Sequence, residues 1–408
     1  MNPNNVTCTA PLTSILIDTN KGVRPCCVYE KYIGNLKTED IVSITNNEEW
    51  KSLKQQMYDN TWPSPCLACK EREELSGGWS VRTLYRDTFD VAGWEEEKLT
   101  YLEFNGSNIC NLACLHCTPG FSSRWVTEQK KVIEFVENTY DFEQHKKVHN
   151  FDIMVVHDND VQSRSPKMHL PDPKLVLENL KLLDLAFLKT INLKGGEPFL
   201  NSETTEILKF LDEQSLLPNI KVHVSTNGTY INDEILNLLK KCKKVNIFIS
   251  VDGTDELFNY IRYGNAKFND IEPVVARIND LDNVSIEFQC SVMNYNIFRL
   301  LDIRIWSNNL RLKYNKISEW TGFTNCVQSP EYLSIRTLSD ASRQQLANFY
   351  KDYNERGEFN NVISTLESSY IGDKIHNSWI DYTNLMQSVR HNDILSIVPE
   401  LTNELTYK

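Results

Sequence analysis

The sequence lacks any uninterrupted run of 18 apolar residues, and its first ten residues do not place a basic segment before an apolar one. A transmembrane helix needs about 20 predominantly apolar residues. A secretory signal needs a basic segment followed by an apolar one. We therefore expect neither a membrane-spanning helix nor an export signal, and we expect a cytoplasmic protein without membrane partners.

Basic residues are in the minority as well, with 43 Lys and Arg against 55 Asp and Glu and a formal net charge of −12. Nucleic-acid-binding surfaces are rich in Lys and Arg, so no general nucleic-acid surface is expected. Repeats and low-complexity tracts are absent, and 41% apolar residues with 24% charged residues are ordinary for a globular protein. With 408 residues the chain can hold one large barrel and a small additional domain.

Cysteine, by contrast, is abundant, with 11 residues. Three of them, Cys110, Cys114 and Cys117, follow the alternating apolar stretch 99–105 in the spacing C-x3-C-x2-C. Three thiolates on one loop can bind three irons of a 4Fe–4S cube and leave the fourth iron open for a ligand. A structural zinc ion would need a fourth ligand, and His116 is poorly placed to supply it. Three ordinary buried thiols are the alternative.

A second group of cysteines lies within residues 1–75. Residues Leu12–Asp18 and Val23–Tyr29 are strand-like on either side of a turn, and we expect a helix near Asn47–Tyr58. Four cysteines from this hairpin and a following C-x2-C pair could bind zinc or an iron–sulfur cluster, and spacing alone does not separate these. The candidate ligands are Cys8, one of Cys26 and Cys27, Cys66 and Cys69.

Strand-like and helix-like segments alternate from residue 99 onward. This alternation is typical of parallel βαβ units, and six repeats favour a partial (β/α)6 TIM-like barrel over a closed eight-fold one. The fold class is thus α/β. The expected strands are 99–105, 190–194, 220–225, 244–250, 283–290 and 310–316. The expected helices are 122–138, 173–186, 202–214, 232–241, 270–280 and 296–307.

The predicted domains are a Cys-rich domain at 1–75, a linker at 76–98, a barrel at 99–335 and a helical C-terminal extension at 336–408. The extension should contain helices near 339–355 and 374–390. The barrel carries a polar insertion at 139–172 with His145, His149, His157 and His169. Because these histidines are irregularly spaced, we interpret the insertion as a surface element that shapes the substrate entrance rather than as a metal site.

Polar motifs end the second, third and fourth expected barrel strands, which is where parallel barrels place their active sites. Glycines let the backbone approach a ligand closely, carboxylates accept from amines, and hydroxyl and amide groups bond ribose or carboxylate oxygens. Tight turns and helix caps are the alternatives. The motif residues are Gly195, Gly196, Glu197 and Pro198, then Ser225 and Asn227, then Ser250 and Asp252.

Two charged residues are candidates for catalysis, although the sequence alone assigns no general acid or base. Asp252 could cap the next helix, contact the substrate or act as a base. Arg262 could bind a substrate carboxylate through its planar guanidinium, or form a surface salt bridge.

The cysteine triplet, GGEP at 195–198, STNG at 225–228 and SVDG at 250–253 together resemble the radical S-adenosylmethionine (SAM) superfamily. The resemblance implies that the open iron binds SAM, that GGEP binds its amino group, and that the other motif residues contact the rest of SAM. It also implies an enzyme of oxidoreductase or maturase type. Reduction would split SAM into methionine and a 5′-deoxyadenosyl radical that abstracts hydrogen from a substrate.

The N-terminal segment resembles the SPASM/twitch auxiliary-cluster domain, although in many relatives that domain follows the barrel. The resemblance implies a second 4Fe–4S cluster at Cys8, Cys26, Cys66 and Cys69, with zinc or no metal as alternatives; Cys27 should then pack in the interior. The matching residues are Cys8, Gly22, Pro25, Cys26, Cys27, Gly34, Asn35, Leu36, Trp50, Cys66 and Cys69.

SPASM/twitch relatives often act on peptides, so the resemblance implies a peptide or protein substrate and an electron donor such as flavodoxin or ferredoxin. A small-molecule substrate, such as a nucleoside or a sugar, is the alternative within enzymes. A non-catalytic iron–sulfur or zinc module that uses the barrel for protein interactions is the alternative outside them.

Overall fold

The computed structural model describes residues 7–76, 80–87, 97–139 and 168–407. The chain divides into two compact units. The first unit contains Met1–Ser107, His169–Ser225 and Asn232–Asn246, and the second contains Asn108–Met168, Thr226–Ile231 and Ile247–Lys408.

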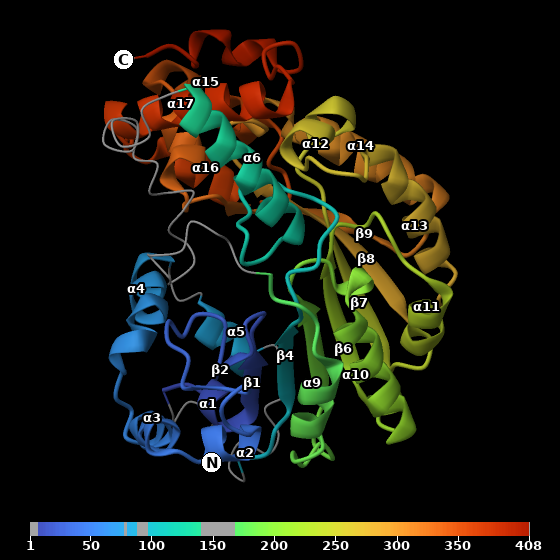
Figure 1. Ribbon diagram of the computed structural model, residues 1–408. Helices are drawn as coiled ribbons and strands as arrows, with labels where there is room; N and C mark the ends of the chain where they lie inside the picture. Colours follow the sequence, from blue (N-terminus) through green and yellow to red (C-terminus); the bar gives the residue numbers. More distant parts are fainter. Residues whose placement is uncertain (1–6, 77–79, 88–96, 140–167, 408) are drawn as a thin grey trace. The chain divides into compact units, whose positions relative to one another are not determined.

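The described strands form one open, mostly parallel sheet in the order β3-β2-β1-β4-β5-β6-β7-β8-β9. Most of these strands are labelled in Figure 1. The fold is therefore α/β, as predicted, and these strands do not close into a barrel because β3 and β9 are edges. The strands are β1 Ser14–Ile17, β2 Gly22–Arg24, β3 Gly34–Asn35, β4 Tyr101–Asn105, β5 Thr190–Lys194, β6 Lys221–Thr226, β7 Lys244–Ser250, β8 Val284–Val292 and β9 Ile317–Cys326.

The N-terminal hairpin of the first unit joins the edge of the sheet. Strands β1 and β2 pair antiparallel, which confirms the predicted hairpin, and β1 also pairs parallel with β4. Strands β4, β5 and β6 continue the sheet in parallel. The first unit contains the helices α1 Ala10–Thr13, α2 Ile41–Thr45, α3 Glu48–Tyr58, α4 Leu67–Ser76, α5 Val81–Asp87, α9 Pro173–Leu180, α10 Ser202–Glu213 and α11 Asp233–Leu239.

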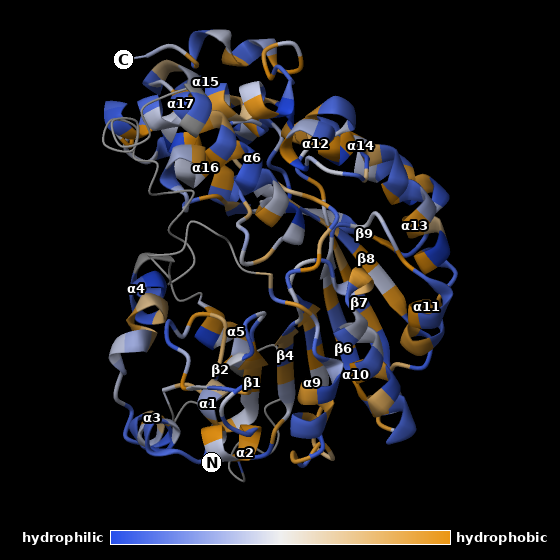
Figure 2. Cartoon of the chain, viewed as in Figure 1, coloured by the Kyte–Doolittle hydropathy of each residue, from blue (hydrophilic) through white to orange (hydrophobic). Residues whose placement is uncertain are grey.

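Strands β4 to β6 have one apolar and one polar face, because successive side chains of a strand point to opposite faces. The apolar face lies in the hydrophobic core, and Figure 2 shows apolar residues along β1 and β4. The apolar residues of β4 to β6 are Leu102, Phe104, Ile191, Leu193, Val222 and Val224. The alternate, polar positions are Tyr101, Glu103, Asn105, Asn192, Lys194 and His223.

The last strand of the second unit differs from the prediction. The expected strand at 310–316 is wrong, because α14 continues to Lys313 and β9 begins at Ile317. Leu310 of α14 is buried whereas Leu312 is 86% exposed, so burial here follows the helical period. Strand β9 pairs parallel with β8. The helices of this unit are α6 Ser123–Thr139, α12 Asp255–Ile261, α13 Ile271–Asn279, α14 Leu300–Lys313, α15 Asp340–Asp352, α16 Asn360–Glu367 and α17 Asp373–Arg390.

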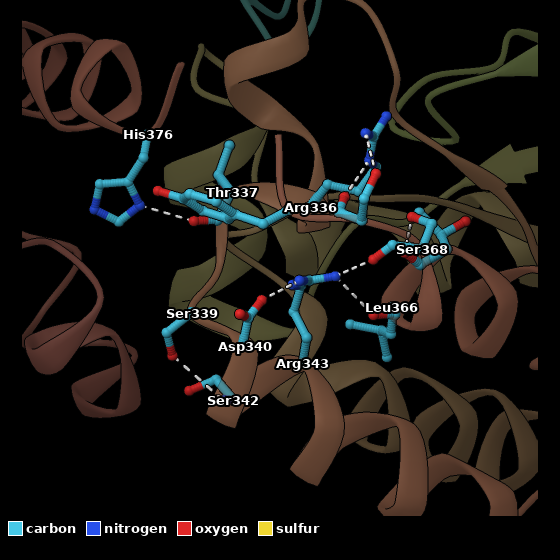
Figure 3. Close-up of polar contacts among 12 residues, drawn as sticks. Arg336, Thr337, Ser339, Asp340, Ser342, Arg343, Leu366, Ser368 and His376 are labelled. Carbon is cyan, nitrogen blue, oxygen red and sulfur yellow. Dashed lines mark hydrogen bonds and ion pairs between the residues drawn. The ribbon is translucent and has the colours of Figure 1, made fainter. Parts of the chain in front are cut away.

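The C-terminal part of the second unit is helical, as predicted, with α16 as an additional helix. Figure 3 shows how buried Arg343 of α15 contacts the C-terminal end of α16. Its guanidinium donates to the carbonyl oxygens of Leu366 (3.0 Å) and Ser368 and pairs with Asp340. Figure 1 shows α6 in the same helical group as α15, α16 and α17, and α6 contacts α17.

Two predictions can be compared with the structure only for the described residues. Residues 140–167 of the predicted insertion, with His145, His149 and His157, lie outside the described residues. Among the residues that are described, no helix has both the length and the apolar character needed to cross a membrane.

Candidate metal and cofactor sites

The three-cysteine loop, residues 110–117, belongs to the second unit and leads into α6. It is held by backbone contacts with the segment that follows α12. Leu112 and Gly264 form an antiparallel bridge, and the Asn265 amide donates to the Asn111 carbonyl at 3.2 Å. A Cβ atom at Gly264 would lie only 2.3 Å from the Asn111 oxygen, so glycine is needed for this close approach.

The three thiols of this loop lie in a largely apolar setting. Cys110 and Cys117 are half-buried and Cys114 is buried, and all three pack with Leu112 and Ala266. Burial raises the pKa of the Cys114 and Cys117 thiols. Since iron binds thiolates, cluster binding at this loop must displace their protons.

Side chains also hold the backbone of the loop. The carbonyl oxygens of residues 113, 114 and 115 accept hydrogen bonds from Arg390 (2.7 Å), Trp125 (2.6 Å) and Tyr382 (2.9 Å), in that order. Trp125 lies on α6, whereas Tyr382 and Arg390 lie on α17. Two helices that are distant in sequence therefore fix the middle of the loop.

Asp252 and Arg262 form a buried pair beside the loop. Arg262 Nε lies 2.8 Å from Asp252 Oδ2, and Arg262 Nη1 lies 3.9 Å from Cys114 Sγ. Asp252 also accepts from the Ser291 amide at 2.8 Å, and His116 Nε2 lies 3.8 Å from its Oδ2. Two of the alternatives for these residues are not found: α12 has Thr254 and not Asp252 as its N-cap residue, and the salt bridge of Arg262 is buried, since Arg262 is 5% exposed.

Asn227 also reaches the loop within the second unit. Its amide nitrogen donates to Asn111 Oδ1 at 2.8 Å and lies 4.0 Å from Cys110 Sγ. Its amide oxygen accepts from Thr229 in a local turn. Ser250, at the end of β7 in the same unit, is half-buried.

The GGEP turn, residues 195–198, follows β5 in the first unit. Ser225 lies on β6 of the same unit and is half-buried. Gly195 has φ +119°, and a Cβ atom there would lie 2.7 Å from the Gly106 nitrogen. Glu197 is 1% exposed, and its carboxylate accepts from the Phe199 amide at 3.1 Å. A backbone of this shape requires glycine and holds a buried carboxylate in one orientation.

Four N-terminal cysteines of the first unit line one cavity, with an empty volume of about 380 Å³ that includes its open mouth. The other lining residues are mostly apolar or aromatic, Trp62 and Tyr85 among them. Burial raises the pKa of Cys8 to about 12 and that of Cys66 to about 11. The four cysteines are Cys8, Cys26, Cys66 and Cys69.

Cys27 differs from its neighbour Cys26 in that it does not line this cavity. We expected Cys27 to pack in the interior, but it is exposed. Cys26 does line the cavity, so the two adjacent thiols are presented in different surroundings.

No three His, Cys, Asp or Glu side chains among the described residues stand within reach of a single metal ion. The four N-terminal thiols are thus arranged around a cavity, not gathered at a point.

Comparisons with known families agree with these two groups of cysteines. Residues 104–298 match the family model of the radical SAM superfamily. Residues 8–70 match the model of SPASM, an iron–sulfur cluster-binding domain. The match to the radical SAM model is thus preceded in the chain by the match to the SPASM model. The N-terminal position of the SPASM domain is the one predicted from the sequence.

Several solved structures resemble the chain at low sequence identity. "Native anSMEcpe with bound AdoMet" is 16% identical, with 62% of this chain and 59% of that chain covered and a TM-score of 0.35. "Crystal structure of Streptococcus suis SuiB bound to S-adenosylmethionine" is 14% identical, with 78% and 61% covered and a TM-score of 0.33. "Structure of TYW1 with a lysine-pyruvate adduct bound" is 14% identical, with 76% and 90% covered and a TM-score of 0.31.

The chain thus spans less than two thirds of the length of the first two of these proteins. A search of curated proteins found no match.

The donor chemistry of both domains fits iron–sulfur clusters. The radical SAM domain presents three cysteines on one loop, as a cube with one open iron requires, and the SPASM domain presents four around one cavity.

Sequence reasoning missed two groups of polar residues in these domains. One is the set of side chains that hold the carbonyl groups of the three-cysteine loop, because their partners are backbone atoms that no motif records. The other is a group of three residues on the polar strand face, in which the buried Glu103 carboxylate accepts from Tyr101 (3.2 Å) and Lys194 (3.2 Å). A glutamate between Leu102 and Phe104, within an expected strand, was the available signal.

Proposed function

We propose that this protein is a radical SAM enzyme with a 4Fe–4S cluster at Cys110, Cys114 and Cys117. The observation that carries the proposal is the three-cysteine loop itself, which lies within the radical SAM match and has its backbone held from several sides. When bound there, the cluster and SAM supply reductive cleavage to methionine and a 5′-deoxyadenosyl radical, which abstracts hydrogen from a substrate.

The residues proposed to bind SAM come from the strand-end motifs. Buried Glu197 is the proposed partner of the SAM amino group, because a carboxylate shielded from water binds an ammonium group more strongly than an exposed one. Gly195 and Gly196 let the backbone approach the ligand. Pro198, Ser225, Asn227, Ser250 and Asp252 complete the proposed set.

Asp252 and Arg262 are proposed to position the loop and not to act as general acid or base. Their side chains are buried and paired with each other, and Arg262 also approaches Cys114 Sγ. Removal of either charge would leave the other buried without its counter-ion, so the pair is assigned to holding the loop in place.

The SPASM domain is proposed to hold a second 4Fe–4S cluster at Cys8, Cys26, Cys66 and Cys69. Zinc is the weaker candidate for this site. The sulfur ligands of one zinc ion lie within about 4 Å of one another, whereas a cube offers four separate irons to thiols arranged around a cavity.

We further propose a peptide or protein substrate, because SPASM domains are often found in enzymes that modify peptides. A nucleoside or sugar substrate is the alternative. The proposed location is the cytoplasm, where a flavodoxin or ferredoxin would supply the electron.

The test compares wild type with the Cys110→Ala/Cys114→Ala/Cys117→Ala variant and with Cys242→Ala as a matched control. Cys242 is a buried thiol that lines neither site. Iron, sulfide and zinc per chain are measured after anaerobic reconstitution, and 5′-deoxyadenosine is measured after addition of SAM and dithionite.

We expect about eight irons in wild type and in the control, about four in the triple variant, and 5′-deoxyadenosine from the first two proteins only. Iron in wild type without any 5′-deoxyadenosine would instead favour a non-catalytic iron–sulfur module. No iron in any of the three proteins would overturn the proposal.

A further inference from the structure

The C-terminal helix α17 supplies two of the three side chains that hold the three-cysteine loop. Tyr382 donates to the carbonyl oxygen of residue 115 at 2.9 Å, and Arg390 donates to that of residue 113 at 2.7 Å. Both side chains are buried, and both lie far outside the radical SAM match at 104–298. The helical extension therefore contacts the middle of the loop directly.

Arg390 has few anionic partners for a buried cation. Its guanidinium lies 4.5 Å from the ring centre of Tyr263 and 5.2 Å from that of Trp125. In the part of the chain that the structure describes, the carboxylate in ion-pair distance is that of Glu128, whose Oε2 lies 3.8 Å from Arg390 Nε. Among the described residues, neither Nε nor Nη1 of Arg390 has a hydrogen-bond partner, although both atoms are buried.

A buried guanidinium that is not fully paired destabilises a protein unless negative charge lies nearby. Here Arg390 Nη2 donates to the carbonyl oxygen of Ala113, the residue directly before Cys114, and Arg262 Nη1 lies 3.9 Å from Cys114 Sγ. Three thiolates and the cluster they hold carry net negative charge, which increases by one unit on reduction. The loop thus brings anionic charge to a place where the protein has buried positive charge.

We propose that α17 is part of the cluster site: Tyr382 and Arg390 fix the backbone of the three-cysteine loop, and the charge of Arg390 stabilises the reduced cluster. The inference rests on the proposed function, since it requires a cluster at this loop. It makes Tyr382 and Arg390 positioning residues, and it adds an electrostatic effect of Arg390 on the reduction potential.

The variants separate charge from hydrogen bonding. Arg390→Met removes the charge at similar length, Arg390→Lys keeps the charge, and Tyr382→Phe removes one hydroxyl donor. Arg343→Met and Tyr350→Phe are matched controls, because these buried side chains also donate to backbone carbonyl groups but do so away from the loop (Figure 3 shows Arg343).

The measurements are the midpoint potential and the rate of iron loss. The potential is followed by the EPR signal that changes when SAM is added, which identifies the cluster at the three-cysteine loop. Iron loss is followed with a chelator. Circular dichroism shows whether each variant is folded.

We expect a more negative midpoint potential in Arg390→Met, because a nearby positive charge favours the reduced cluster, and a nearly unchanged one in Arg390→Lys. Tyr382→Phe should keep the potential but lose iron about two- to tenfold faster, as expected for one lost hydrogen bond. Arg343→Met and Tyr350→Phe should match wild type in both measurements.

Equal potentials in wild type and a folded Arg390→Met would overturn the electrostatic part. Iron loss from Tyr382→Phe as slow as from Tyr350→Phe would overturn the positioning part. If Arg390→Met does not fold, Arg390→Lys must still lose iron faster than wild type, because its ammonium cannot reproduce the guanidinium geometry. A wild-type protein without a SAM-responsive signal would contradict the proposed function itself.

Discussion

Arg262 and Asp252 form a buried ion pair in which Arg262 Nε lies 2.8 Å from Asp252 Oδ2. The pair lies beside the three-cysteine loop, because the same guanidinium also lies 3.9 Å from Cys114 Sγ. Two motifs that are more than 130 residues apart in sequence are thereby coupled through one side chain.

Breaking this pair should destabilise the protein strongly. Asp252→Asn leaves the Arg262 guanidinium buried without its anion, which costs about 3–5 kcal/mol in comparable pairs. The measurement is the free energy of unfolding in urea. Glu272→Gln is the control, because its partner Lys313 is exposed and such pairs contribute about 0–1 kcal/mol. Equal losses in the two variants would contradict the assignment of the Asp252 pair as buried and structural.

Gly195→Ala should impair both stability and SAM binding. The residue has φ +119°, and the added Cβ atom would lie 2.7 Å from the Gly106 nitrogen. Strain of this kind costs about 1–3 kcal/mol and would distort the turn that holds Glu197. Gly322→Ala is the control, since its Cβ atom would meet nothing closer than 3.4 Å. SAM affinity is measured by equilibrium dialysis, and wild-type affinity in Gly195→Ala would argue against this turn as a SAM contact.

Cys26 and Cys27 provide an internal comparison for the proposed second cluster. Cys26→Ser should lose iron from the SPASM domain, lowering the total by up to about half, because Cys26 lines the four-cysteine cavity. Cys27→Ser should keep the wild-type iron content, because the Cys27 thiol is exposed and does not line it. The measurement is the iron and sulfide content of each variant. Loss of iron in Cys27→Ser with the wild-type content in Cys26→Ser would instead identify Cys27 as the ligand.

His223 should make the protein less stable in acid. Burial, together with Lys221 and Lys194, lowers the pKa of this imidazole from its ordinary 6.5 to about 4. Between these values the unfolded chain binds a proton that the folded protein does not, so stability falls as pH drops from 6.5 to 4. The loss attributable to this group is up to about 3 kcal/mol.

The test is the free energy of unfolding measured across this pH window. His223→Gln keeps a polar partner for Asn246, whose amide lies 3.3 Å from the ring, and should flatten the profile. His391→Gln changes an exposed histidine and should leave the profile as in wild type. An unchanged slope in His223→Gln would show that other groups cause the acid sensitivity.

Local sequence patterns predicted most elements of the fold because each pattern reflects a local physical requirement. The strands at 190–194 and 244–250 appear with the predicted bounds. The prediction of a strand at 310–316 was wrong, because these residues belong in part to helix α14. Apolar and charged residues alternate at the end of this helix, and over so short a segment such alternation is also typical of a strand. The parallel pairing of β1 with β4 was beyond prediction, because it joins segments more than 80 residues apart.

By itself, the sequence determined the α/β class, the two groups of cysteines and the glycines of the GGEP turn, since spacing and residue type suffice for each. Only the tertiary structure decided which side chains hold the three-cysteine loop. Arg390 and Tyr382 donate to backbone carbonyl oxygens. Because every residue has a carbonyl oxygen, no pattern in the sequence identifies which one accepts the bond. The position of α17 within the second unit brings these two donors to the three-cysteine loop.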